Sequence, residues 1–243
     1  TKNVSREGPS RTIGSANSGA ANVLTVNNTS NTATSSAQVA ISTAGATADD
    51  PTLLLTTTTT SWIVGVDNSV TVPTADPFVI SQGSALGTNN IMSVATNGEI
   101  NYPLQPSFLA TANLQSDVTG DGTAYTVIFA NEIFDQNGDF SSTTFTAPVT
   151  GRYQINFSME ISGLAVTNTT GNIQIVTSNR TVVTNTWNYG VVMNISTIVR
   201  CVGGILIDID KDDICTIVVQ IQNGTKVVDI IATNSTFSGF LQA

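Results

Sequence analysis

The sequence contains no histidine, and only eight of its 243 residues are Lys or Arg, against 17 Asp and Glu. The absence of histidine removes the commonest general base and the commonest metal ligand, and it excludes a Ser–His–Asp triad. Because phosphate binding needs Lys and Arg, the net charge of −9 argues against nucleic acid and against an anionic membrane surface as partners. No run of about 18 apolar residues is present, so membrane insertion is not expected.

Carboxylates are too sparse to suggest a glycan-cleaving enzyme. Glycosidases need two carboxylates on either side of a sugar cleft, and the chain has only the four glutamates Glu7, Glu99, Glu132 and Glu160, in no recognisable pair. No Gly-x-Ser-x-Gly elbow is present either. The sequence therefore predicts that the protein is not an enzyme.

The two cysteines, Cys201 and Cys215, both stand in strand-like segments. Free cysteine is among the most buried residue types, so two small buried side chains are expected, and a disulfide is the alternative. Two cysteines without histidine make neither a disulfide framework nor a zinc site.

Polarity comes mainly from Thr, Ser and Asn, since charged residues make up 10% of the chain and hydrophobic residues 40%. Together with Val and Ile, these residue types favour strands and turns over helices. The composition predicts an all-β protein. So little surface charge is typical of extracellular fibres and adhesins, whose chains bury long strand faces against one another.

The first part of the chain divides into two regions. Residues 1–21 are rich in Ser, Gly, Ala and Asn without periodicity, which predicts a linker or disordered end. Residues 22–103 carry short strand-like runs between Asn/Ser/Thr clusters, with a turn at Asn97-Gly98. Val26-Asn-Asn-Thr and Val66-Asp-Asn-Ser form a faint repeat, which suggests β-rich shaft repeats that intertwine between chains. The expected strands are 22–26, 37–42, 52–55, 62–66, 77–81 and 91–94.

Residues 104–243 have a different pattern, with more aromatic residues and longer strands. In residues 151–161 apolar and polar side chains alternate strictly. This places every second residue on one face: Tyr153, Ile155, Phe157, Met159 and Ile161. Residues 205–221 predict a hairpin of two long strands around the charged turn 210–213. Many long antiparallel strands with regular turns predict a sandwich or jelly roll.

Two segments carry a family resemblance: Phe145-Thr-Ala-Pro-Val-Thr-Gly-Arg-Tyr-Gln-Ile-Asn-Phe157 and, near the end, Thr236-Phe-Ser-Gly-Phe-Leu241. In this order they resemble the globular head of complement C1q and its relatives, which share the tumour-necrosis-factor-like jelly roll. The resemblance implies a ten-stranded jelly-roll sandwich of two sheets that associates as a homotrimer. The residues it assigns to core and trimer packing are Phe145, Gly151, Tyr153, Phe157, Phe237, Gly239 and Phe240.

The chain also departs from that family. It has no collagen-like Gly-X-Y period before the head; "SWIVGVDNS", "FVIS" and "LGTNN" instead resemble the β-rich shafts of phage, viral or bacterial trimeric fibres. In several relatives, acidic residues in the loop before the Gly203 strand hold calcium. Here residues 187–198 contain no Asp or Glu, so that calcium site is not expected.

Two other acidic segments are weak calcium candidates. Calcium loops place oxygen ligands at alternate positions, as residues 135–139 do, and the 208–213 segment is the densest acidic cluster. Solvated turns are the favoured interpretation of both, so no cofactor is expected and calcium is the alternative. The candidate ligands are Asp135, Asn137, Asp139, Asp210, Asp212 and Asp213.

These observations lead to the hypothesis of a trimeric fibre-tip adhesin, outside the cell on a virion or cell-surface fibre, that binds a cell-surface glycan or protein. Jelly-roll heads are rigid scaffolds whose loops carry the binding function. The candidate loops are 166–171 and the segment Trp187, Asn188 and Tyr189, whose aromatic rings suit sugars or apolar patches. The alternative is a purely structural trimerisation cap or capsid decoration without a ligand.

Overall fold

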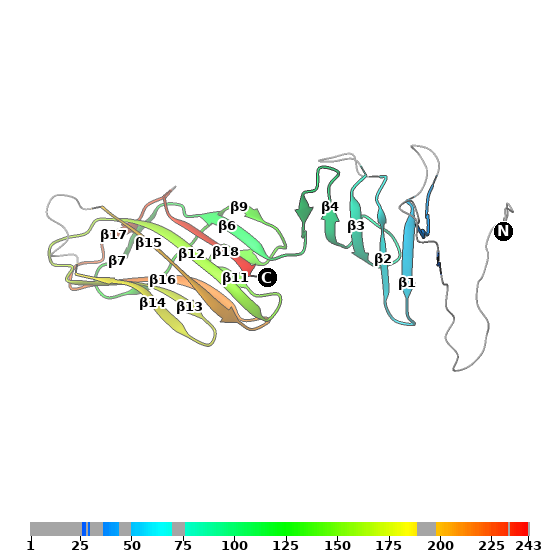
Figure 1. Cartoon of the computed structure of the whole chain (residues 1–243). Helices are drawn as coiled ribbons and strands as arrows, with labels where there is room; N and C mark the ends of the chain where they lie inside the picture. The colour runs from blue at the N-terminus through cyan, green and yellow to red at the C-terminus, as the bar shows by residue number, and fades with distance from the viewer. Residues whose placement is uncertain are drawn as a thin grey trace.

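The computed structural model describes residues 26–27, 29, 36–43, 50–69, 76–188, 198–232 and 234–242. All regular elements in these residues are strands, β1 to β18, arranged in three antiparallel sheets (Figure 1). The all-β prediction is thus confirmed. No helix in the described part of the chain is long and apolar enough to cross a membrane.

The first sheet is a five-stranded meander in the order β1-β2-β3-β4-β5, drawn as a single layer in Figure 1. The predicted turn at Asn97-Gly98 joins its last two strands: the Gly98 N–H donates to the Ala95 carbonyl at 2.9 Å, and Gly98 has a φ of 90°. Glycine adopts this positive φ without steric cost. The strands are β1 (Thr52–Thr56), β2 (Ser61–Val66), β3 (Phe78–Gln82), β4 (Asn90–Val94) and β5 (Ile100–Asn101).

The expected strand at 37–42 is absent. These residues are described, are exposed and form no regular structure, because they pair with no strand in the described part of the chain. Val39, at 62% exposure, therefore differs from Val79, which is buried in β3, although the two stand at matching offsets in the sequence repeat. Of the strand expected at 22–26, only Val26 is described, and it is not in a strand.

The remaining strands form a jelly roll of two sheets, as the resemblance predicted. The seven-stranded sheet has the order β7-β17-β12-β18-β6-β9, and its seventh strand, β15, also pairs with β12. The six-stranded sheet has the order β10-β11-β16-β13-β14, and its sixth strand, β8, also pairs with β16. Short segments such as β8 and β10 count as separate strands, which gives more segments than the ten expected. The bounds are β6 (Ser107–Thr111), β7 (Gln115–Thr119), β8 (Ala124–Thr126), β9 (Asn131–Asp135), β10 (Phe140–Ser141), β11 (Thr144–Thr146), β12 (Gly151–Ser162), β13 (Thr170–Thr177), β14 (Thr181–Trp187), β15 (Val199–Ile209), β16 (Ile214–Gln222), β17 (Val228–Ile230) and β18 (Thr236–Gln242).

The core lies between these two sheets. Alternate residues of β12, from Tyr153 to Ile161, are buried against alternate residues of β13 and β16, which confirms the alternation read from the sequence. An aromatic cluster fills one end: the Phe108 ring stacks on Phe140 and Phe145 with centroids 4.7 and 4.9 Å apart, and the Phe237 ring meets it edge-on at 4.9 Å. Both stacked and edge-on aromatic pairs stabilise a core beyond the area they bury.

The predicted hairpin over 205–221 is wrong. β15 pairs with β12 in one sheet, whereas β16 pairs with β8, β11 and β13 in the other. Turn 210–213 is therefore an arch across the core, with Asp212 at a φ of 70°. The apolar sides of both strands face the same core from opposite sheets, which a hairpin within one sheet would not allow. Turn 135–139 likewise joins β9 of one sheet to β10 of the other.

The two cysteines lie in opposite sheets and are free thiols. Cys201 in β15 is opposite Met159, and Cys215 in β16 is opposite Phe145. Both are buried, and burial raises the pKa of each thiol to about 12. They are small core side chains, as expected.

Replacing Phe108 by Ala should remove the ring at the centre of the aromatic cluster and lower the free energy of unfolding by about 3–5 kcal/mol. The control is Ile133→Ala, because Ile133 is 60% exposed and its loss should cost about 0.5 kcal/mol or less. Denaturant unfolding followed by tryptophan fluorescence measures both. Equal midpoints for the two variants would contradict this account of the core.

Candidate binding surfaces of the head

The jelly roll has two distinct ends, which we call the base and the apex. The chain enters at the base, where Ser107 of β6 pairs with Phe240 and Gly151 of β12 pairs with Ile209. At the apex, Ile161 of β12 pairs with Val199. Gly171 at the start of β13 lies there between Ile221 and Trp187, so the loop before β13 and the end of β14 share the apex. In Figure 1 the apex is the end of the head farthest from the five-stranded sheet.

The apical loop 163–169 is held in place by Asn168, which is 1% exposed. Its Oδ1 accepts a hydrogen bond from the Ala165 N–H at 2.8 Å, and its Nδ2 donates to the carbonyls of Gly120 and Gln222 at 3.2 and 3.3 Å. These bonds tie the loop to the neighbouring turn and strand. Val166, at 70% exposure, is thereby presented on a pre-organised loop.

Of the three residues predicted to bind a ligand, two are described. Trp187 is the last residue of β14, and its backbone pairs with Gly171 beside the Asn168 loop. Asn188 follows it and is exposed. Tyr189 lies outside the described residues, as do residues 190–197 of the loop in which relatives hold calcium.

The residues that the resemblance assigned to packing occupy two places. Six of the seven face the core or approach it closely. Four of these are buried rings: Phe145, Tyr153, Phe157 and Phe237. The other two are glycines packed against side chains, because a Cβ on Gly151 would lie 2.5 Å from a carbon of Leu241, and one on Gly239 would lie 2.8 Å from a carbon of Phe108. The Tyr153 hydroxyl donates to the Val149 carbonyl at 2.7 Å, which satisfies its one buried polar group. Phe240 differs, because it is 45% exposed on the outer face of the seven-stranded sheet.

Around Phe240 the outer face carries an exposed apolar patch. Cross-strand register places Leu206, Gln154 and Phe240 in one row, and Val202, Ser158 and Thr236 in a parallel row. Val202 is 68%, Leu206 48% and Phe240 45% exposed. We call Val202, Leu206 and Phe240, with Leu109 and Phe134 of the adjoining strands, the outer patch.

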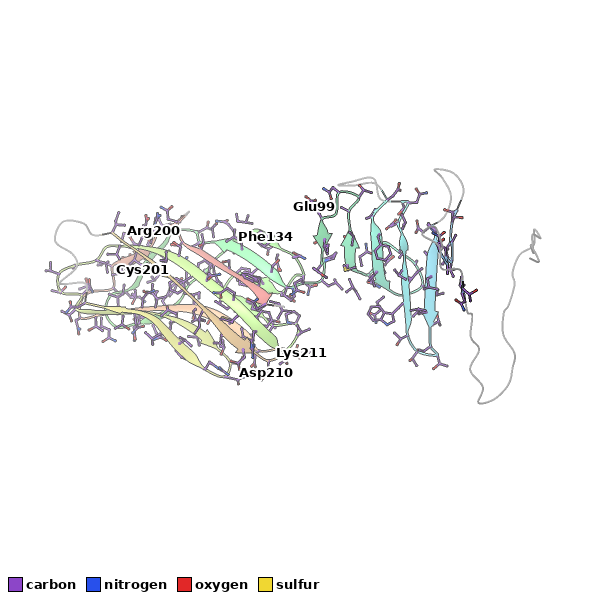
Figure 2. All side chains as sticks on the ribbon, viewed as in Figure 1. Glu99, Phe134, Arg200, Cys201, Asp210 and Lys211 are labelled. Carbon is purple, nitrogen blue, oxygen red and sulfur yellow. The ribbon has the colours of Figure 1, made fainter. Side chains whose placement is uncertain are left out.

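Ion pairs border the outer patch on two sides. Arg200 contacts Glu160 at 2.6 Å beyond Val202, and Arg180 contacts Asp208 at 2.7 Å beyond Leu206. Figure 2 shows Arg200 towards the apex and Phe134 nearer the base. Hydrogen bonding to Arg200 lowers the pKa of Glu160, and hydrogen bonding to Arg180 lowers that of Asp208. The patch therefore combines exposed apolar side chains with the polar, outward-facing Gln154 and Ser158 of β12 between them, inside a charged rim, and such mixtures are common in protein interfaces.

The comparisons with known proteins agree with this geometry. Residues 108–242 match the C1q domain. The chain belongs to the C1q domain family. Domains of this family are typically extracellular, trimeric, non-enzymatic binding modules.

Similar solved structures include three jelly-roll heads. The globular domain of zebrafish complement 1qA is 20% identical, with 57% of this chain and 98% of that chain covered and a TM-score of 0.39. Murine APRIL is 11% identical (57% and 99% covered, TM-score 0.41), and Eiger TNF from S. frugiperda is 10% identical (57% and 93% covered, TM-score 0.40). No curated protein matches the sequence.

At the base of the C1q domain, the first group of calcium candidates forms a turn. Asp135 Oδ1 accepts hydrogen bonds from the N–H groups of Gly138 and Asp139 at 3.1 Å each, and Oδ2 accepts one from Phe140 at 2.8 Å. Asn137 Nδ2 donates to Asp139 Oδ2 at 3.0 Å. Burial raises the pKa of Asp139, and the Asn137 bond partly opposes this. The Asp135 carboxylate thus holds the backbone of the turn, and the side chains of Asn137 and Asp139 are bonded to each other.

The second group of candidates is also engaged in pairs. Lys211 Nζ contacts Asp212 at 2.8 Å, and Asn179 Nδ2 donates to Asp213 Oδ2. Asp210 is exposed at the same turn, which Figure 2 places at the base. Among the described residues, no three His, Cys, Asp or Glu side chains gather as a metal site would require. A hollow of about 410 Å³ separates this turn from residues 138–141.

The sequence pattern predicted loop 166–171 as a binding segment but did not indicate that Asn168 anchors it. Nothing in the local sequence distinguishes Asn168 from the exposed Asn179. Its role depends on carbonyls of residues 120 and 222, which are distant along the chain.

Replacing Asp135 by Ala should destabilise the C1q domain by about 1–3 kcal/mol, since three backbone N–H groups lose a charged acceptor. Asp210→Ala is the control, because Asp210 is exposed. We expect millimolar calcium to change the thermal midpoint of neither the parent protein nor the variants. A calcium-dependent rise that Asp135→Ala abolishes would instead show a metal site at this turn.

Proposed function

We propose that the protein is the trimeric tip of an extracellular fibre, on a virion or a cell surface, and that it attaches the fibre to a surface glycan or protein. The observation that carries the proposal is the separation of the two ends of the head. The chain enters at the base, and the pre-organised loop and the end of β14 lie at the opposite apex. In a fibre, the apex is the part that meets another surface first.

The outer patch supports a homotrimer. Large apolar side chains such as Val202, at 68% exposure, are costly to leave in water, and several of them on one sheet face support an interaction surface there. Gly204, which pairs with Asn156, also lies on this face, in the row between the rows of Val202 and Leu206. Family members are typically trimeric, so further copies of this chain are the expected partners of the patch.

The apex supports ligand binding. The Asn168 bonds hold loop 163–169 in one conformation, so little conformational entropy would be lost on binding. By residue type, the candidate residues Trp187, Asn188 and Tyr189 provide two aromatic rings and an amide, groups that suit the apolar faces and hydroxyls of a sugar or a polar protein surface. A trimer would present three apices, so weak binding at each could give strong attachment.

The proposed organisation of the chain follows from this role. Residues 1–21 serve as a linker or disordered end, residues 22–103 contain the shaft, and residues 104–243 form the head. The described five-stranded sheet lies within the second region, and its last strand ends at Asn101, shortly before Pro103 and Pro106.

Placing a charge in the outer patch tests the trimer. Leu206→Asp should give monomers or strongly weakened trimers, because three buried carboxylates near one axis would repel and lose hydration. Val183→Asp is the control: Val183 is 51% exposed, close to the 48% of Leu206, but lies on β14 of the other sheet. Light scattering coupled to size exclusion measures the mass. A monomeric mass for the parent protein would contradict the proposal.

A glycan array and a cell-surface binding screen, run on protein of measured mass, test attachment. Trp187→Ala and Asn188→Ala should lower binding by about tenfold or more if they contact the ligand. Lys211→Ala at the base is the matched surface change and should bind as the parent does. A proven trimer that binds nothing in either screen would favour the alternative, a structural cap without a ligand.

A further inference from the structure

The five-stranded sheet has one face made almost entirely of apolar side chains. Its register aligns Leu53, Val64, Ile80 and Met92 in one row, and Val66, Phe78, Val94 and Ile100 in the next. Leu55 and Trp62 continue the face, and Gln82 is its one polar member among these paired positions. We call the ten apolar residues the shaft face: Leu53, Leu55, Trp62, Val64, Val66, Phe78, Ile80, Met92, Val94 and Ile100.

No described residue buries the shaft face. Leu53, Leu55, Trp62, Phe78 and Ile100 are 48%, 57%, 41%, 42% and 56% exposed, and the other five members are only partly buried. By contrast, the inward residues of β12 in the head are 3% exposed or less. The shaft face has the composition of a core and the exposure of a surface.

The opposite face of the five-stranded sheet is partly covered by a short segment of the same chain. The segment between β3 and β4 folds over it: Ser81 Oγ donates to Asn90 Oδ1 at 2.6 Å, and a Cβ on Gly87 would lie 3.3 Å from Asp67 Oδ2. Within the described residues of this sheet, the buried large apolar side chains are only Ile63 and Val79. Two such side chains cannot offset the entropy of ordering five strands, because a sheet is stable only when an apolar face is covered.

The charges around the sheet restrict what could cover the shaft face. From residue 50 to residue 101 the charged residues are Asp50, Asp67, Asp76 and Glu99, and none belongs to the shaft face. No Lys or Arg occurs between Arg11 and Arg152. A charged partner, whether acidic or basic, would gain no ion pair on this face. The occupant must be apolar and uncharged.

The N-terminal part of the same chain offers few apolar side chains that could cover the shaft face. Residues 1–49 contain few large apolar side chains, and two of these, Val39 and Ile41, are 62% and 50% exposed. A second copy of the shaft face, however, matches the first in extent, in polarity and in lack of charge. Three copies related by a threefold axis would each contribute one layer to a closed, shared core.

We propose that the shaft face packs against the same face of two other copies, on the threefold axis of the head, so that the five-stranded sheet folds around an intermolecular core. This inference rests on the proposed trimer of the head. It makes residues 50–101 part of the trimer interface, and it assigns their stability to assembly rather than to the single chain.

Neighbouring leucines of β1 provide a matched test. Leu53, Leu54 and Leu55 are 48%, 47% and 57% exposed in one chain, but Leu54 pairs with Ile63 on the opposite face. The double variant Leu53→Asp/Leu55→Asp should be cut by thermolysin within residues 50–101 about tenfold faster than the parent, whereas Leu54→Asp should resemble the parent. Trypsin is unsuitable, because this region has no Lys or Arg. Equal cleavage of the two variants would overturn the proposal.

Cross-linking separates this proposal from that of the head. Ile80→Cys, at the middle of the shaft face, should form interchain disulfides under mild oxidation, and Leu54→Cys should not; the native thiols are buried and should stay unreactive. A trimeric mass with no cross-link through Ile80→Cys would overturn the shaft interface and leave the head trimer intact. A monomeric mass would overturn both. Cross-linking as strong through Leu54→Cys would place the interface on the wrong face and also overturn the proposal.

Discussion

A β-sheet with one apolar face must cover that face, and this constraint organises both parts of the protein. In the head the constraint is met within one chain: β12 presents alternate side chains from Tyr153 to Ile161 to strands of the second sheet. The five-stranded sheet has no second layer among the described residues, and its shaft face stays open. The same rule therefore yields a self-contained fold in the head and, in the proposed assembly, a core that the five-stranded sheet shares with other copies.

In the proposed function, the head keeps the surface that binds a ligand, the apex, apart from the base, where the chain enters. At the base, the Asp135 carboxylate accepts hydrogen bonds from backbone N–H groups and so stabilises the end at which the chain enters. At the apex, Asn168 fixes a loop whose neighbouring residues remain exposed. The sides of the head carry the outer patch. In the proposed function, ligand contact, trimer contact and attachment to the shaft thus occupy different surfaces and do not compete.

Local patterns were sufficient for the fold class and for several elements. The strict alternation of β12, the Asn97-Gly98 turn and the burial of Cys201 and Cys215 follow from the chemistry of adjacent residues, and the structure contains all of them. Strand pairing could not be read in the same way. β15 and β16 look like a hairpin because a short charged turn joins them, yet each pairs with strands distant in sequence. A turn sequence does not state whether the chain returns in the same sheet or crosses to the other.

By itself, the sequence determined the all-β class, the resemblance of residues 145–157 and 236–241 to the C1q family, and the absence of histidine chemistry. These three depend only on residue type and on the spacing of near neighbours. Only the tertiary structure decided which apolar residues remain uncovered. Phe237 and Phe240 stand three positions apart in one strand, but one is in the core and the other lies on the outer patch. Leu53 and Leu54 lie on opposite faces of one sheet, yet their exposed fractions in one chain are nearly equal, at 48% and 47%. Exposure is set by which strands and layers lie opposite a side chain, and those contacts come from segments far apart in the chain.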